Sequence, residues 1–212
     1  MKNACTLFFL IISVSIFSQI PSYYNDVNLT LKGKDLKDEL ATKIISTHTN
    51  TLSYTPGVWE ALKKTDQDPK NASKVVLLYG WNDAITNNIN KRTRNKNKKG
   101  GGLGSWNREH TYPKSLATPN LGTSGAGADA HNLRPCDTKK NSSRSNKKFE
   151  DGKGYSKITA NGNWYPGDEW KGDVARMMLY MYLRYGNQTL PKNIGIGKRN
   201  KSDANMVDLF LK

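Results

Sequence analysis

Cysteine is scarce in this sequence, which has two cysteines in 212 residues, Cys5 and Cys136. Cys5 lies in an apolar N-terminal stretch that resembles an export signal, so its removal would leave Cys136 with no partner thiol. Internal disulfides are therefore excluded for the processed chain, and we expect Cys136 to be a small packed residue rather than a nucleophile. Stability must then come from the hydrophobic core or from a bound metal.

Long apolar runs are also scarce. The hydrophobic content is 36% and the mean hydropathy is -0.72, which predicts extensive loops and surface. The most pronounced run covers residues 7–17 and follows Lys2, an order that is typical of a secretory signal peptide. It is too short and too close to the start for a transmembrane helix. We therefore expect residues 1–18 to be a signal peptide, residues 19–212 to form one exported domain, and no membrane partner.

Acidic residues are few relative to basic ones. The chain has 33 Lys plus Arg against 18 Asp plus Glu, a formal net charge of +15. Such an excess favours binding to phosphate backbones through the release of counterions, although cationic surfaces also attract membranes and acidic polysaccharides. The densest basic run, residues 91–99, is expected to be a solvated mobile loop or a loop that contacts DNA, and both descriptions can hold together.

Apolar residues recur at helical spacing in three stretches. The first predicts a helix over residues 34–45. The second predicts a short helix with Thr55 as N-cap and Pro56 at its first position. The third predicts a helix from about residue 168 to residue 185, which Gly186 would end.

Three runs that suit extended structure predict strands, namely residues 75–79, 106–112 and 131–134. Pro113 and Pro135 are expected to stop the last two of these strands. Asp137 is expected to cap a helix that runs through Asn141 and Arg144. Because serine and asparagine are poor helix formers, that helix would need tertiary or metal support.

Residues 106–146 concentrate the groups that could carry chemistry. Hydrolysis of a phosphodiester needs an activated water, charge relief on the phosphoryl oxygens and help for the departing oxygen. A neutral imidazole can take the proton of water near pH 7, so His110 fits a general base. The carboxylate of Glu109 and the amide oxygen of Asn141 fit ligands of a hard divalent cation. Arg134 and Arg144 could bind the phosphate.

The residues alone leave two questions about this site open. Adjacent residues of a flat strand point to opposite faces, so Glu109 and His110 share a site only if the strand bulges or ends there. Pro113 makes such an end credible. His131 and Asn132 are expected to support the fold through hydrogen bonds rather than to act on a substrate.

Four motifs together resemble the bacterial endonuclease I family, namely WNREH at 106–110, PKS at 113–115, DAHNLRP at 129–135 and NSSRSN at 141–146. The similarity extends from about Tyr23 to the C-terminus. It implies an α+β fold in which a ββα-metal (His-Me) finger is embedded in a mainly helical single domain. It also implies a secreted or periplasmic bacterial nuclease that cuts DNA, and we expect RNA, with little sequence preference, leaving 5′-phosphates.

The resemblance also assigns roles to residues. His110 would be the general base, and Glu109 and Asn141 would hold one Mg²⁺, with Mn²⁺ or Ca²⁺ as alternatives. Contacts to the phosphates are expected from four arginines, Arg108, Arg134, Arg144 and Arg176. Arg176 could instead only pair with Asp173. No obligatory protein partner is expected, and family members usually continue beyond the equivalent of Lys212, so we expect a short form or a lost C-terminal segment.

Two other functions fit the same sequence. The first is a cationic protein that binds nucleic acids through a degenerate, inactive finger. The second is a zinc-dependent hydrolase that uses His110 and His131, which is weakened by the lack of a third nitrogen or sulfur ligand at a usable spacing. Cleavage assays and metal analysis separate these alternatives from the nuclease.

Overall fold

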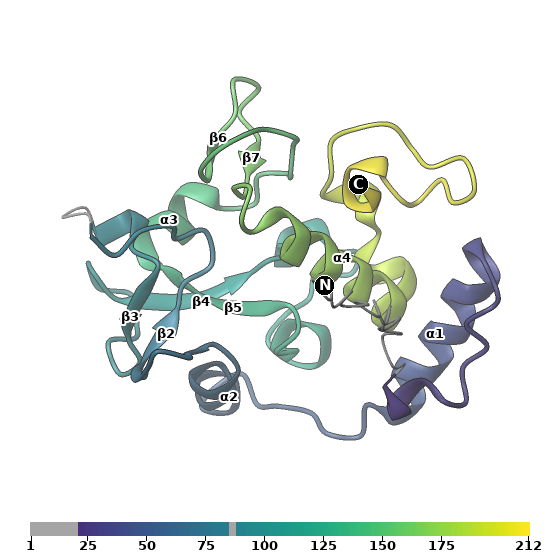
Figure 1. Ribbon diagram of the computed structural model, residues 1–212, viewed down its shortest axis with the longest axis horizontal. Helices are drawn as coiled ribbons and strands as arrows, with labels where there is room; N and C mark the ends of the chain where they lie inside the picture. Colours follow the sequence, from purple (N-terminus) through teal and green to yellow (C-terminus); the bar gives the residue numbers. More distant parts are fainter. Residues whose placement is uncertain (1–20, 85–87) are drawn as a thin grey trace, which may run out of the picture.

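The computed structural model describes residues 21–84 and 88–212, so the expected signal peptide at 1–18 lies outside the described residues. Figure 1 shows the chain order of the elements. The described residues contain four α-helices, α1 (Gly33–Thr47), α2 (Gly57–Thr65), α3 (Thr138–Arg144) and α4 (Lys171–Tyr185). They contain seven short strands, β1 (Gln67–Asp68), β2 (Asn71–Val76), β3 (Thr93–Asn95), β4 (Trp106–His110), β5 (Leu133–Asp137), β6 (Lys157–Ile158) and β7 (Trp164–Tyr165).

The strands form three small antiparallel sheets, β1-β2-β3, β4-β5 and β6-β7. In the central pair, β4 and β5 run in unbroken register from the Trp106–Asp137 pair to the His110–Leu133 pair. Helix α3 follows β5 directly and contacts both strands. The expected α+β class is confirmed, whereas a mainly helical domain is not, because much of the described chain lies in loops and short 3₁₀ turns.

The β4–β5 pair separates two hydrophobic clusters. On one face, Trp106 and Leu133 join Val58 and Leu62 of α2 in a cluster that includes Val75 of β2. On the other face, Cys136 joins the larger cluster that is built on α4, with Val174, Met178 and Met181 at its centre. Side chains of a strand alternate between the two faces, so each strand serves both clusters. The expectation that Cys136 is a packed residue is confirmed by its full burial.

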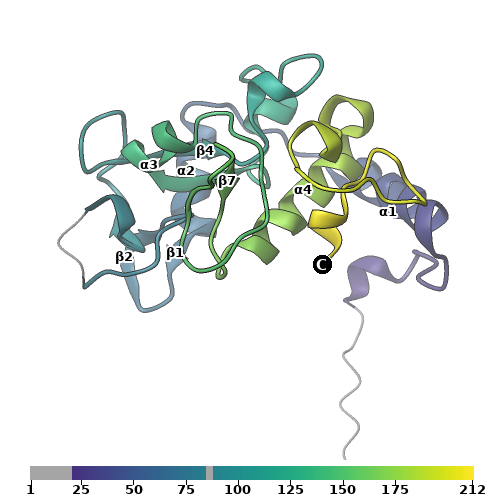
Figure 2. The ribbon, with the colours of Figure 1, turned by 90° about the horizontal axis from the view of Figure 1, so that it is seen from above.

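Helix α1 lies at one end of the molecule, beside α4 in both views (Figures 1 and 2). It contains no buried residue, and its contacts include a hydrogen bond from Lys37 Nζ to the hydroxyl of Tyr182 at 3.1 Å. The helices predicted at residues 34–45 and 168–185 are confirmed, although α4 begins three residues later than expected. No helix within the described residues is long and apolar enough to cross a membrane.

Pro135 does not stop a strand, and this prediction was wrong. Strand β5 begins at Leu133 and continues through Pro135 to Asp137. The bond from Thr111 N–H to Asn132 O fixes the alternation of the ladder, which leaves Arg108 and Pro135 as a pair that exchanges no hydrogen bonds. A proline, which has no N–H to donate, is therefore tolerated at this position.

The basic run at residues 91–99 is not only a loop. Residues 93–95 form β3, which pairs with β2, and both Thr93 and Arg94 are buried. The guanidinium of Arg94 lies 2.6 Å from the carboxylate of Asp137, the residue that caps α3. Periodicity could not predict this strand, because a buried charged side chain is compensated by a partner more than forty residues away.

The strand predicted at residues 75–79 is shifted, because β2 starts at Asn71 and ends at Val76. The chain turns at its end, where Tyr79 has a φ of 68° and the N–H of Gly80 donates to the carbonyl of Leu77 at 3.0 Å. Gly80 then passes close to the backbone of the basic run. A Cβ atom at Gly80 would lie 2.2 Å from the carbonyl oxygen of Lys91 and 2.8 Å from Cα of Arg92.

The substitution Gly80→Ala is therefore expected to lower the free energy of unfolding by about 1–3 kcal/mol, because backbone atoms cannot move aside cheaply. The measurement is urea denaturation followed by tryptophan fluorescence. Gly101→Ala is the matched control, since nothing lies within 4 Å of its Cβ position, and should change stability by about 0.5 kcal/mol or less. Equal stability of the two variants would show that the turn at Gly80 is not tightly packed.

Candidate active site

His110 is the last residue of β4, where it stands opposite Leu133. Its Nε2 lies 2.9 Å from the carbonyl oxygen of Gly127, and its ring stacks on that of Tyr54 with centroids 5.8 Å apart. A carbonyl oxygen can only accept, so Nε2 carries the proton in this bond. In the neutral ring, Nδ1 is then the nitrogen that can take up a proton.

The pKa of His110 is lowered to about 4, chiefly by burial and to a smaller extent by the positive charges of Lys114, Arg108 and Arg144, against the bond to Gly127, which raises it. The imidazole is therefore neutral near pH 7. A neutral ring with one nitrogen fixed and the other available suits a general base.

Glu109 precedes His110 and is almost fully buried, with 2% of its surface exposed. Its Oε1 accepts a hydrogen bond from the hydroxyl of Tyr79 at 3.2 Å and lies 3.1 Å from a guanidinium nitrogen of Arg144. Burial raises the pKa of Glu109 to about 7, although Arg144 and Tyr79 both lower it. Within the described part of the chain, both partners use Oε1, which leaves Oε2 with free lone pairs.

Helix α3 holds Asn141 and Arg144 against β4. The helix starts as expected, with the carboxylate of Asp137 accepting from the N–H groups of Lys139 at 2.8 Å and Lys140 at 3.1 Å. The side-chain amide of Asn141 donates to the carbonyl of Arg108 at 3.2 Å. That bond engages the nitrogen of Asn141 and leaves Oδ1 as a second oxygen donor beside the strand that carries Glu109.

The side chains of Glu109 and His110 leave β4 on opposite faces. Arg108 and His110 share a face, since both contact the ring of Tyr54, whereas Glu109 turns toward Tyr79 and α3. The ladder has no bulge, but β4 ends at His110. A strand end is one of the two conditions under which neighbouring residues can approach a common ligand.

Two of the four candidate arginines, Arg144 and Arg108, donate to backbone carbonyls of the protein. Arg144 is fully buried and donates to the carbonyls of His110 at 2.9 Å and Thr111 at 2.7 Å, besides contacting Glu109. A phosphate-binding role does not fit a side chain without exposed surface, so we assign Arg144 to the positioning of Glu109. Arg108 is partly buried, lies over the rings of Tyr54 and Trp59, and donates to the Tyr54 carbonyl.

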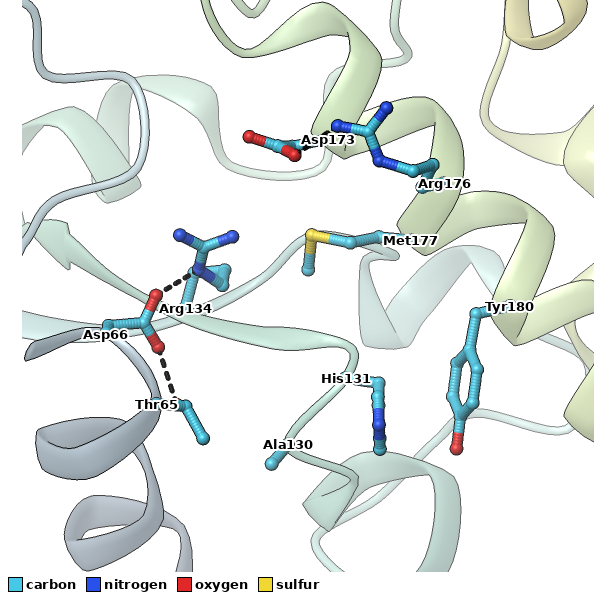
Figure 3. A pocket seen from close by; sticks show the side chains of 9 residues that line it. All are labelled: Thr65, Asp66, Ala130, His131, Arg134, Asp173, Arg176, Met177 and Tyr180. Carbon is cyan, nitrogen blue, oxygen red and sulfur yellow. Dashed lines mark hydrogen bonds and ion pairs between the residues drawn. The ribbon is translucent and has the colours of Figure 1, made fainter. Parts of the chain in front are cut away.

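Arg134 and Arg176 line a pocket of about 460 Å³ between β5 and α4 (Figure 3). Nε of Arg134 donates to the carboxylate of Asp66, while its other guanidinium nitrogens remain available within the described residues. Arg176 pairs with Asp173 in the preceding turn of α4, as one of the two alternatives expected, yet keeps 74% of its side chain exposed. Both arginines can therefore reach an anion in this pocket.

His131 and Asn132 differ in their surroundings. Asn132 is buried and bonds both backbone groups of Tyr112, accepting from its N–H at 2.7 Å and donating to its carbonyl at 3.2 Å. This geometry fits the expected scaffold role. The ring of His131 lies on the ring of Tyr180 with centroids 4.3 Å apart, and 63% of the side chain is exposed to the pocket. Among the described residues, no three His, Cys, Asp or Glu side chains are grouped so that they could hold a metal.

Three groups at this site had no signal in the sequence. The carbonyl of Gly127 is backbone, Tyr54 comes from the segment before α2, and Tyr79 reaches Glu109 from the turn after β2. Among them, Tyr79 has an unusual backbone, with a φ of 68°. A non-glycine residue in the left-handed region is uncommon and is often found at functional sites.

The sequence model of the endonuclease I family matches residues 32–212. The chain belongs to the endonuclease I family. The resemblance drawn from the four motifs is thereby confirmed over nearly the whole described chain, including β4, β5 and α3.

Two similar relatives are each named "Extracellular ribonuclease". The protein from Bacillus subtilis (strain 168) is 48% identical over 160 residues, which cover 72% of this chain and 50% of that protein. The protein from Bacillus amyloliquefaciens is 45% identical over 171 residues, 77% of this chain and 53% of that protein. The chain therefore spans about half the length of the curated relatives it matches. No solved structure gives a significant match.

Asp129, two residues before His131, allows the contribution of this segment to stability to be tested by varying the pH. Its carboxylate accepts from His131, from the hydroxyl of Tyr180 at 2.9 Å and from the hydroxyl of Tyr185 at 2.7 Å. Burial alone would raise the pKa of Asp129, but these bonds outweigh it and lower the pKa to about 2. The resulting stabilisation is present above the unfolded value of 3.8 and is lost as the pH falls through about 2.

Asp129→Asn is therefore expected to lower the free energy of unfolding by about 2 kcal/mol at pH 7, with a difference that shrinks as the pH falls from 4 toward 2. Urea denaturation at a series of pH values measures it. Asp35→Asn, at an exposed carboxylate in the first turn of α1, should change stability by about 0.5 kcal/mol or less. A difference that does not depend on pH would contradict the assignment.

Proposed function

We propose that this chain is a secreted, metal-dependent endonuclease that hydrolyses phosphodiester bonds of DNA and RNA with little sequence preference. The observation that carries the proposal is the neutral imidazole of His110 at the last residue of β4, the strand that also carries Glu109 and whose Arg108 carbonyl accepts from Asn141. Membership of the endonuclease I family supports nuclease chemistry. The two relatives are named extracellular ribonucleases, which supports RNA as a substrate and export of the protein.

The residues of the site fit a hard divalent cation. Glu109 offers a free Oε2, and Asn141 offers a free Oδ1 because its nitrogen is bound to Arg108. Burial raises the pKa of Glu109 to about 7, so the neighbouring Arg144 does not fully offset the cost of burying the ionised carboxylate. A cation held by two protein oxygens and completed by water would do so, and Mg²⁺ is the ion that suits this ligand set, with Mn²⁺ or Ca²⁺ as alternatives.

In the proposed reaction, Nδ1 of His110 takes a proton from water while its Nε2–H stays bound to the carbonyl of Gly127. The water oxygen forms a bond to phosphorus, and the bond from phosphorus to the 3′ oxygen breaks on the opposite side. The departing oxygen receives a proton from solvent, so the products carry a 5′-phosphate and a 3′-hydroxyl. A bound divalent cation supplies charge relief to the phosphoryl and leaving oxygens.

Low sequence preference follows from the kind of contact that the site offers. Arg134 and Arg176 face the pocket with guanidinium groups that suit phosphate oxygens, and contacts to phosphates carry no direct information on base sequence. The net charge of +15 adds a general attraction for nucleic acids. The apolar run at residues 7–17 supports export of the chain as a signal peptide.

The proposal is tested by nicking of supercoiled plasmid with Mg²⁺ and with EDTA. The unsubstituted chain should nick only with the divalent cation, and His110→Ala should lower the rate by about 10²- to 10⁴-fold, the usual contribution of a general base. Asn141→Ala should cause a loss that added cation partly restores. Asp35→Asn is the control, because it changes an exposed side chain in the first turn of α1 and none on β4.

Measurement of DNA binding by the same variants distinguishes a nuclease from an inactive cationic protein. The His110→Ala variant should keep most of its affinity for DNA, with a salt dependence close to that of the unsubstituted chain. Tight, salt-sensitive binding by a chain that cuts neither DNA nor RNA with Mg²⁺, Mn²⁺ or Ca²⁺ would instead favour the inactive protein. One tightly held zinc ion would favour the zinc hydrolase.

A further inference from the structure

We propose that Trp81 and Tyr155 form a platform on which an unpaired base of a single-stranded nucleic acid stacks. The two rings are nearly parallel, with centroids 4.0 Å apart and an interplanar angle of 13°. Trp81 covers one side of Tyr155, yet Tyr155 remains 61% exposed, so its other side is open to solvent. Every nucleobase has an aromatic face that can lie on such a ring.

The platform is held in place on the Tyr155 side. The N–H of Gly154 donates to the carboxylate of Asp168 at 2.7 Å, and the N–H of Asp168 donates back to the carbonyl of Gly154 at 2.8 Å. On the other flank, the hydroxyl of Ser156 donates to the carbonyl of Tyr79 at 2.8 Å. Because the residues before and after Tyr155 are both anchored, little ordering is required of this loop when a base binds.

The same bonds connect the platform to the candidate active site. Tyr79 accepts the bond from Ser156 through its backbone and donates through its side chain to Glu109 at 3.2 Å. Trp81 is only two residues beyond Tyr79, a separation of at most about 7 Å along the chain. The left-handed backbone of Tyr79 directs its side chain into the core while the chain continues to the surface. The platform and Glu109 are therefore connected through a single residue, Tyr79.

Charge favours nucleic acid as the occupant of the platform. The N–H of Trp81 donates to the carbonyl of Asn90 at 3.1 Å, so the platform adjoins the basic run at residues 91–99. Stacking rings beside a basic track are the usual means by which proteins bind single strands. Asp168 and Glu169 line the hollow next to the platform, where Asp168 accepts from the N–H of Gly154 and Glu169 pairs with Arg92 of the basic run. A neutral sugar could also stack on a tyrosine, but it would gain nothing from the basic run.

This inference rests on the proposed function and narrows its substrate. Bases in a duplex are stacked within the helix, so they cannot lie on Tyr155 unless the helix opens. The platform therefore favours single-stranded RNA or DNA, and unpaired regions of folded RNA, over duplex DNA. It adds base contacts that depend on pairing state and not on sequence.

The test uses the full chain with His110→Ala, in EDTA, and measures fluorescence anisotropy of a labelled single-stranded oligonucleotide. Adding Tyr155→Ala should raise the Kd for the single strand by about 5- to 100-fold, the range found for the loss of one stacked base. Tyr155→Phe should stay within about twofold, and Tyr155→Leu should behave as Tyr155→Ala. Tyr23→Ala, which removes an exposed ring far along the chain, is the matched control and should not change the Kd.

Two further ligands, an abasic strand and a duplex, distinguish the loss of base stacking from a general loss of binding. A strand of the same length with abasic sites should bind the parent more weakly and should not distinguish Tyr155→Ala from it. The ratio of duplex to single-strand Kd should fall in Tyr155→Ala. Equal loss for the single strand, the abasic strand and the duplex would overturn the platform, as would competition by a neutral oligosaccharide as effective as that by a single strand.

With His110 intact and a divalent cation present, Tyr155→Ala should raise KM for single strands while kcat changes less. Failure of the proposed function is recognised separately, because the unsubstituted chain would then leave plasmid and RNA uncut with every divalent cation. A chain that cuts both substrates, but whose single-strand Kd and KM are unaffected by Tyr155→Ala, retains the proposed function and excludes the platform.

Discussion

The buried contact between Glu109 and Arg144 is the constraint on which the site depends. Both side chains are almost fully enclosed, and a buried charge is costly unless it is paired and hydrogen bonded. Arg144 meets this requirement with bonds to Glu109 and to the carbonyls of His110 and Thr111. One guanidinium therefore fixes the carboxylate and the end of β4, while its own position is set by the length of α3.

Helix α3 is short and rich in residues that form helices poorly, so it depends on its surroundings. Its first turn is capped by Asp137, which Arg94 of β3 also contacts. Its last turn is held by Arg144 against β4. These long-range charged contacts join β3, β4 and α3, and they explain why a seven-residue helix can present Asn141 in a defined orientation.

Sequence reasoning was strongest where local chemistry acts alone. Asp137 as the N-cap of α3, the helices at α1 and α4, and the burial of Cys136 follow from capping, periodicity and side-chain size. It was weakest where contacts between residues far apart in the sequence determine the structure. Residues 93–95 look like a solvated basic run until Asp137 is placed beside Arg94, and Pro135 looks like a strand end until the pairing with Arg108 shows that no N–H is needed there.

By itself, the sequence determined the family, through four motifs of fixed residue types, together with the basic charge and the residues that could supply a base and oxygen ligands. The tertiary structure decided what each of them can do. It placed Arg144 in the core and left Arg134 and Arg176 at a pocket, and it fixed His110 against Gly127. The reason is physical: burial and long-range partners set the charge and the accessibility of a side chain, and neither is encoded by its local neighbours.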